Sequence, residues 1–173
     1  VVSVSEPKNH FPLAQASDHV LLAGGIGITP ILAMAQQLHR EGQRFEMHYA
    51  ARSQGHAAFV PQLQAMPWVG QLHTHWDDGP QAQRLNLSAL IGAPRTDRHL
   101  YVCGPSGLIE ATRAQARALG WADAQVHFEL FGAEVAPQAG DQPFTVIVGS
   151  TGQRVEVPAD QTPLQALLAA GLN

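Results

Sequence analysis

The chain has 173 residues, of which 45% are hydrophobic and 14% charged, and its formal net charge is −4. This balance predicts a compact domain with an appendage, because a disordered chain would be poorer in apolar residues and richer in charge. The ten Lys and Arg residues form no basic run, which argues against a nucleic-acid partner. No apolar stretch is long enough for a bilayer and no leader pattern is present, so we expect a cytoplasmic protein without a membrane partner. The single cysteine, Cys103, excludes an internal disulfide and a thiolate-based metal site.

Short β-type runs alternate with helical stretches over the first three quarters of the chain, which is typical of βαβ units around a parallel sheet. Strands are predicted at residues 19–23, 45–50, 71–76, 99–103 and 125–130. Helices are predicted at residues 30–40, 56–66 and 107–119, with a short helical turn at residues 86–91. Thr29 is the expected N-cap of the first helix, and Pro61 predicts that the second helix starts late or is kinked. We therefore expect an α/β fold with a five-stranded parallel sheet and helices on both faces.

The composition changes after residue 132, where small residues and two prolines replace the periodic pattern. A linker is expected there, at residues 133–143. Beyond it, residues 144–148 and 154–157 alternate around a glycine-containing turn and predict a β-hairpin, and residues 162–170 predict a short helix. The chain is thus expected to hold a domain at residues 18–132 and the start of a second at residues 144–173.

A glycine-rich turn lies directly between the first predicted strand and the first predicted helix. It contains Gly24, Gly25 and Gly27, followed by Thr29. In this context a turn places backbone N–H groups and the positive end of a helix against a pyrophosphate. The spacing G-G-x-G-x-T-P departs from the G-x-G-x-x-G pattern of two-domain dehydrogenases. The competing interpretation is a tight turn with no ligand, and the glycines alone leave the two about even.

Two further groups of residues follow strand ends. Cys103-Gly104-Pro105 closes the fourth predicted strand, and Glu129 and Phe131 lie near the end of the fifth. Ligands of open α/β sheets bind outside the carboxyl ends of the strands, so these residues should face the same crevice as the glycine turn. Taken alone, Cys103 is better interpreted as a buried small hydrophobe. For Glu129 and Phe131 the alternatives are a solvated acid with an edge aromatic, or a carboxylate and a ring bordering a flavin and a nicotinamide.

His73 and His75 share one face of the third predicted strand and could suggest a metal site. They lack a clear third ligand, so no metal site is predicted. The following Asp77-Asp78-Gly79 is interpreted as a turn.

Four motifs occur in order over about 110 residues: AGGIGITP (23–30), HYAARS (48–53), YVCGP (101–105) and HFELFG (127–132). This ordered set resembles the ferredoxin-NADP reductase superfamily, and within it the phthalate dioxygenase reductase and vanillate demethylase reductase group. The resemblance implies that residues 1–17, with SEPKNHFPL as a strand, end a flavin-binding β-barrel. It also implies that residues 144–173 begin a β-grasp, plant-type ferredoxin domain, and that the acid-Gly stretch near residue 78 helps to shape the nucleotide site.

The resemblance implies an activity for an intact parent protein. Such an enzyme would pass a hydride from NADH or NADPH to FMN, and then electrons through a [2Fe-2S] centre to a terminal oxygenase that acts on aromatic rings or demethylates. The flavin signature Arg-x-Tyr-Ser/Thr and the cluster run C-x4-C-x2-C are both missing from these residues. FMN and [2Fe-2S] are therefore not expected here, and the chain is expected to be a fragment that is inactive alone.

The resemblance also implies roles for particular residues. Binding of the pyrophosphate and ribose side of the nucleotide is expected at Gly24, Gly25, Gly27, Ile28 and Thr29. The adenosine ribose is assigned to Arg52 and Ser53. The nicotinamide is assigned to Cys103, Gly104 and Pro105, and the flavin side to Glu129 and Phe131.

The second predicted strand ends in Arg52-Ser53-Gln54, without the acid that usually repels a 2′-phosphate, so NADPH is not excluded beside NADH. A different hypothesis also stays open. The chain could be a non-catalytic, regulatory nucleotide-binding module with a protein-interaction tail. A reading frame that continues into the flavin and cluster signatures would favour the reductase.

Overall fold

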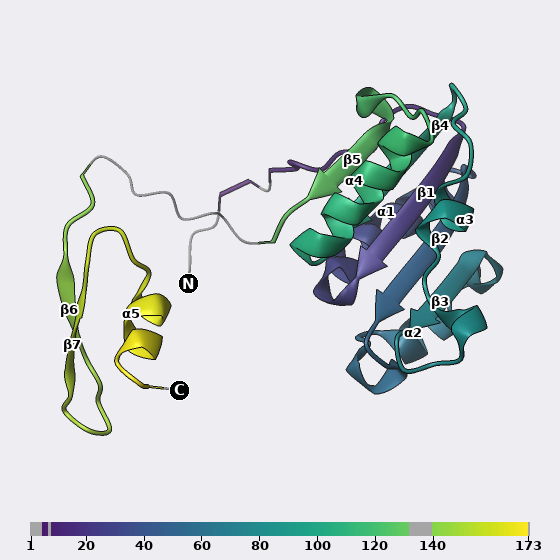
Figure 1. The fold of residues 1–173 in the computed structure, drawn as a ribbon. Coiled ribbons are helices and arrows are strands. Elements are labelled where there is room, and N and C mark those ends of the chain that lie inside the picture. Colours follow the sequence, from purple (N-terminus) through teal and green to yellow (C-terminus); the bar gives the residue numbers. More distant parts are fainter. Residues whose placement is uncertain (1–4, 7, 132–139, 173) are drawn as a thin grey trace. The chain divides into compact units, whose positions relative to one another are not determined.

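The computed structural model describes residues 5, 6, 8–131 and 140–172. They belong to two compact units, Val1–Phe131 and Gly132–Asn173, and each unit is described by itself (Figure 1). Among the described residues no helix is long and apolar enough to cross a membrane.

The first unit is built on a five-stranded sheet in which every neighbouring pair is parallel. Its strands are β1 (Asp18–Gly24), β2 (Arg44–Ala51), β3 (Leu72–Trp76), β4 (Arg98–Cys103) and β5 (Val126–Glu129). The order is β3-β2-β1-β4-β5, so the chain moves outward from β1 to β3 and then returns to the other side of β1. This reversal leaves a crevice at the carboxyl ends of β1 and β4, where doubly wound sheets bind their ligands.

Helices cover both faces of this sheet, which confirms the predicted fold class (Figure 1). They are α1 (Ile28–Arg40), α2 (Val60–Gln64), α3 (Leu87–Ile91) and α4 (Ser106–Ala118). Successive residues of a strand point to opposite faces. On β1, Leu21 therefore packs in the core with α1 and α2, while Leu22 packs with α3 and α4.

The starts of two helices depend on local backbone geometry. A 3-10 turn (Gly25–Gly27) leads directly into α1, so Gly27 is the N-cap and makes no side-chain cap. The N-cap prediction for Thr29 was wrong, because its Oγ1 instead donates to the carbonyl of Ile26 at 3.1 Å. In α2 the helix starts late, as Pro61 predicted, after Phe59 in a left-handed conformation with φ of 62°.

The segment that enters β1 is attached to the sheet by an aromatic side chain. Phe11 is buried and its ring centroid lies 5.9 Å from that of Tyr101, whose hydroxyl accepts a hydrogen bond from the Ala14 N–H at 2.7 Å. The described residues of the 5–13 stretch form no strand, in contrast to the expected barrel strand. A strand requires neighbouring backbone partners, and the sheet pairings of the described residues provide none there.

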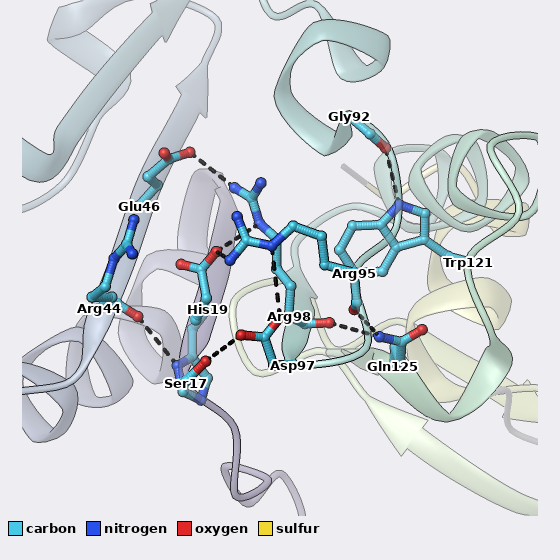
Figure 2. Close-up of polar contacts among 11 residues, drawn as sticks. Ser17, His19, Arg44, Glu46, Gly92, Arg95, Asp97, Arg98, Trp121 and Gln125 are labelled. Carbon is cyan, nitrogen blue, oxygen red and sulfur yellow. Dashed lines mark hydrogen bonds and ion pairs between the residues drawn. The ribbon is translucent and has the colours of Figure 1, made fainter.

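The amino ends of β1 and β4 are joined by charged side chains (Figure 2). The buried Asp18 forms ion pairs with Arg95 at 3.0 Å and with Arg98 at 3.3 Å. Arg98 also reaches Glu46 on β2 at 3.1 Å. The Gln125 side chain donates to the carbonyl oxygens of Arg95 and Arg98 at 2.6 and 3.0 Å. These contacts connect β2, β1, β4 and the entry to β5 at one edge of the sheet.

The second unit confirms the predicted hairpin and helix. Strands β6 (Phe144–Ile147) and β7 (Arg154–Val157) are antiparallel and are followed by α5 (Pro163–Ala169). Thr162 accepts from the Gln165 N–H, and the Gln165 side chain accepts from the Thr162 N–H, which completes a capping box. A small core of Val155, Val157 and Ala166 joins the hairpin to the helix.

Candidate nucleotide-binding site

Two strand-to-helix turns, β1 to α1 and β4 to α4, meet in direct backbone contact. A Cβ on Gly27 would overlap the carbonyl group of Cys103, and a Cβ on Gly104 would lie 2.9 Å from the α-carbon of Gly24. Such approaches are impossible for a residue with a side chain. The glycines at these positions therefore allow the two turns to form one continuous surface at the switch point.

Gly25 has a different role from its neighbours. Its φ is +53°, in the left-handed region, and a Cβ there would meet nothing within 4 Å. The backbone conformation thus favours glycine at this position, which faces open space at the N-terminal side of α1. This placement suits a phosphate, which the first turn of a helix and its dipole would stabilise.

A pocket of about 460 Å³ adjoins these turns. It runs from the glycine turn across the end of β2 to the residue after β3, with α4 on the other side. Its lining residues are Gly24, Gly25, Ala50, Ala51, Arg52, His56, Asp77, Leu85, Pro105 and Leu108. Apolar walls with a few convergent polar groups are typical of small-molecule sites.

The polar end of the pocket is built from the loops after β2 and β3. Ser53 Oγ lies 2.7 Å from His56 Nδ1, which fixes the loop after β2. The N–H of Asp77 donates to the Ala51 carbonyl at 3.1 Å, and so places Asp77 beside Arg52. Asp77 and His56 were not among the predicted site residues. An acid directly after a strand, at the ligand-binding edge of the sheet, was the signal that could have identified Asp77.

Cys103 is buried beneath the turns with no exposed surface. Burial, together with the nearby charge of Glu129, raises the pKa of its thiol to about 11, although the Gly104 N–H favours the thiolate. A thiol with this pKa is neutral at pH 7 and is not a nucleophile. Cys103 packs within the apolar core on the α1 side of the sheet. It therefore lies beneath the crevice without exposing an atom to it.

Glu129 and Phe131 lie apart from the main pocket. Glu129 pairs with Cys103 across the β4–β5 ladder and lines a second pocket of about 420 Å³ with Pro30 and Met34. Phe131 is 48% exposed.

The structure therefore divides the predicted site residues into groups. Gly24, Gly25, Arg52 and Pro105 line one pocket, and Glu129 lines another. Gly27, Ile28, Cys103 and Gly104 are buried beneath the turns. Thr29 and Phe131 are exposed, and Ser53 is half-buried.

Other possible sites have weaker support. A pocket of about 470 Å³ at the amino edge is lined by His19, Gln37 and Glu41. The glycine beside it, Gly42, follows the end of α1, so the pocket faces the C-terminal end of that helix, which does not favour an anion. In the described part of the chain, no group of three or more His, Cys, Asp or Glu side chains could hold a metal ion.

The parallel sheet and its paired glycine turns define a dinucleotide-binding α/β domain of the ferredoxin-reductase type. The chain belongs to the family whose model is described as the N-terminal domain of dimethylamine monooxygenase subunit DmmA-like proteins, which matches residues 8–126.

Individual relatives agree with the predicted resemblance. The chain is 48% identical over 172 residues to a vanillate O-demethylase oxidoreductase of Pseudomonas sp. (strain HR199 / DSM 7063), covering 99% of this chain and 54% of the relative. It is 36% identical over 174 residues to the phthalate dioxygenase reductase of Burkholderia cepacia, covering 99% and 53%.

A solved structure of phthalate dioxygenase reductase superimposes with a TM-score of 0.70 at 35% identity, over 98% of this chain and 53% of that one. That structure is described as modular, for electron transfer from pyridine nucleotides to [2Fe-2S]. The chain thus spans about half the length of these relatives.

Proposed function

We propose that the first unit binds a nicotinamide dinucleotide across the carboxyl edge of its sheet. The pyrophosphate lies at Gly24, Gly25 and the start of α1, and the adenosine extends toward Arg52. The observation that carries this proposal is the contact of the two glycine turns beside the 460 Å³ pocket.

The nicotinamide end of the nucleotide extends in the other direction, toward β4 and β5. Gly104 and Pro105 border the ring there, with Cys103 as a neutral, buried support. Glu129 and Phe131 close the side on which the ring meets its electron acceptor. Ile28 and Thr29 stabilise the pyrophosphate turn, and Ser53 orients His56 beside the ribose.

The wider role is that of a reductase component in an oxygenase system. In the intact protein, FMN would take the hydride of NADH or NADPH, a [2Fe-2S] centre would carry single electrons, and a terminal oxygenase would receive them. The names of the relatives support this role. These 173 residues do not fit the [2Fe-2S] centre, because Cys103 is their only cysteine and four thiolates hold such a cluster. The chain itself contributes nucleotide binding and orientation.

Titration calorimetry of the full chain with NADH and with ADP-ribose tests the proposal. We expect one nucleotide per chain, with Gly25→Val abolishing binding because the side chain would fill the mouth of the pocket. Gly42→Val is the matched control, since Gly42 also has a positive φ, +67°, and open space at its Cβ position. Equal loss of binding in both variants, or no binding to the unmodified chain, would reject the site.

A further inference from the structure

Part of the apolar wall of the nucleotide pocket lies on the loop between β3 and α3, residues 77–86. Leu85 of this loop lines the pocket together with Leu108 and Pro105. It is half-buried and packs against the core on the α4 side of the sheet. The contacts that attach this loop to the sheet therefore decide where the wall of the pocket lies.

His75, near the end of β3, attaches the middle of the loop to the sheet. Its Nδ1 lies 3.3 Å from the carbonyl oxygen of Gln83. Within the described residues, the hydrogen bonds of residues 80–85 that leave the loop end on this ring. Its Nε2 lies 3.0 Å from Nδ1 of His48 on β2, and the two rings are nearly parallel, at 16°. His48 is buried, so the ring of His75 connects the loop to a fixed point in the sheet.

The hydrogen-bond partners define where each ring carries its proton. Burial lowers the pKa of His75 below its ordinary value of 6.5 and lowers the pKa of His48 to about 3, so both rings are neutral near pH 7 and each has one N–H. A carbonyl oxygen can only accept, so the proton of His75 is on Nδ1, and its Nε2 accepts from the Nδ1–H of His48. The other nitrogen of His48, Nε2, is buried without a hydrogen-bond partner among the described residues, which agrees with its carrying no proton. One directed chain of hydrogen bonds thus runs from β2 through β3 to the loop.

We propose that His75 is a positioning residue for nucleotide binding, which holds the loop after β3 so that Leu85 presents an apolar wall to the bound nucleotide. The inference rests on the proposed function, since it requires the nucleotide in the 460 Å³ pocket. His75 does not line that pocket and acts through Gln83, two residues before Leu85. A loop without this attachment would lose conformational freedom when the nucleotide binds, and that loss weakens binding.

Calorimetric titration of the full chain with ADP-ribose tests this role. His75→Leu removes both hydrogen bonds of the ring and should weaken binding about fivefold. His75→Gln keeps an amide N–H for Gln83 and an amide oxygen for His48, so it should restore the affinity to within about twofold of the unmodified chain.

A double-variant experiment tests whether the effect passes through Leu85. Leu85→Ala should weaken binding about fivefold, because it removes apolar surface from the wall. When His75→Leu is added to Leu85→Ala, the further loss should be less than about twofold, since the group that His75 positions is already absent. A residue that only stabilised the fold would add its full effect in this background.

His73→Leu is the matched control. His73 is on the same strand, and its ring also packs against His48, with the centroids 4.8 Å apart. In the part of the chain that the structure describes, no hydrogen bond joins its side chain to the loop, and it does not line the pocket. This variant should leave the affinity within about twofold of the unmodified chain.

The possible failures are distinguishable. If ADP-ribose does not bind the unmodified chain, the proposed function itself fails. If it binds but His75→Leu keeps the affinity, or His73→Leu loses as much, the site stands and the role of His75 is overturned. The role is also overturned if His75→Gln binds as weakly as His75→Leu, or if the losses from His75→Leu and Leu85→Ala add in full. Circular dichroism and thermal melting of each variant confirm that the fold is retained.

A measurement on the unmodified chain does not depend on how the variants fold. Nitrogen NMR of the imidazole rings at pH 7 should show His75 with its proton on Nδ1 and a bare Nε2. A His75 ring with its proton on Nε2 could not donate to Gln83, and would overturn the role of His75.

Discussion

The two edges of the parallel sheet use charged residues in opposite ways. At the amino edge, Asp18 is buried and paired with Arg95 and Arg98, both of which are labelled in Figure 2. At the carboxyl edge, Arg52 and Asp77 line the same pocket, and neither charged group has a side-chain partner among the described residues. Charges that are satisfied within the fold stabilise it, whereas unsatisfied ones at an open edge are available to a ligand. This contrast predicts that mutations at the two edges separate stability from binding.

The largest effect is expected from Gly27→Ala, which should force the two glycine turns apart. The new methyl group would overlap backbone atoms of Cys103 and Gly104, which cannot move independently of β4. We expect a loss of about 3 kcal/mol in the free energy of unfolding and no detectable nucleotide binding. Urea unfolding and calorimetry measure the two effects.

Gly107→Ala is the matched control for this change. Gly107 lies in α4 and a Cβ there would meet nothing within 4 Å. Alanine should therefore stabilise the chain by about 0.5 kcal/mol and leave binding intact. Equal stability of the two variants would contradict the packed-turn interpretation.

At the amino edge, Asp18→Ala should lower stability without affecting the ligand. It leaves Arg98, whose side chain is only 14% exposed, with Glu46 as its remaining acidic partner. We expect a loss of about 2 kcal/mol in the free energy of unfolding, because breaking a buried ion pair leaves a desolvated charge. The affinity for ADP-ribose should stay within about twofold. A large loss of affinity in a folded variant would show that the two edges are not independent.

Acid should destabilise the fold through a histidine cluster on β2 and β3. The rings of His73 and His75 lie 4.8 and 5.3 Å from that of His48. Burial, assisted by the charges of His73, His75 and Arg98, lowers the pKa of His48 from 6.5 to about 3. Below pH 6.5 the unfolded chain therefore binds more protons than the folded chain. The contribution of His48 to the free energy of unfolding is complete above pH 6.5 and is lost as the pH falls toward 3.

One such histidine can change the free energy of unfolding by at most about 1.4 kcal/mol per pH unit. Replacing His48 by Gln removes this titrating group. The free energy of unfolding, measured with urea, should then fall less steeply between about pH 6 and pH 4. His39→Gln, in the exposed last turn of α1, is the control and should leave the slope unchanged. Identical slopes for the original chain and the His48 variant would rule out the cluster as the cause.

The smallest effect is expected on the outer surface of α4. Arg117 and Asp123 form an ion pair at 3.4 Å in which both side chains are largely exposed. Arg117→Gln should change the free energy of unfolding by less than about 0.5 kcal/mol. If Arg117→Gln lowered the free energy of unfolding as much as Asp18→Ala, burial would not explain the difference expected between the two ion pairs.

The strands of the sheet could be predicted from the sequence to within one residue at each end. Their apolar runs are short and bounded by turn residues, and the helices between them require parallel pairing. The start of α1 could not be predicted from the sequence. A 3-10 turn (Gly25–Gly27) leads directly into this helix, so its N-cap is Gly27 and not the expected Thr29.

The predicted site was incomplete for a related reason. Sequence order places Asp77 far from Arg52, and only the β2–β3 ladder brings them together. The contact of Gly27 and Gly104 with the opposite turn likewise depends on tertiary packing. Residues that follow strands were identified when their own motif was recognisable, as for Cys103-Gly104-Pro105. The resemblance linked the acid-Gly stretch near residue 78 to the nucleotide site, but Asp77 itself was interpreted as a turn residue.

Amide hydrogen exchange of the full chain with and without ADP-ribose tests the central claim most directly. We expect saturating ligand to slow exchange at residues 24–29, 51–56 and 77–79, and to leave exchange at the amino edge around Asp18, Arg95 and Arg98 unchanged. Slower exchange confined to the amino edge, or none at saturation, would contradict a nucleotide site at the glycine turns.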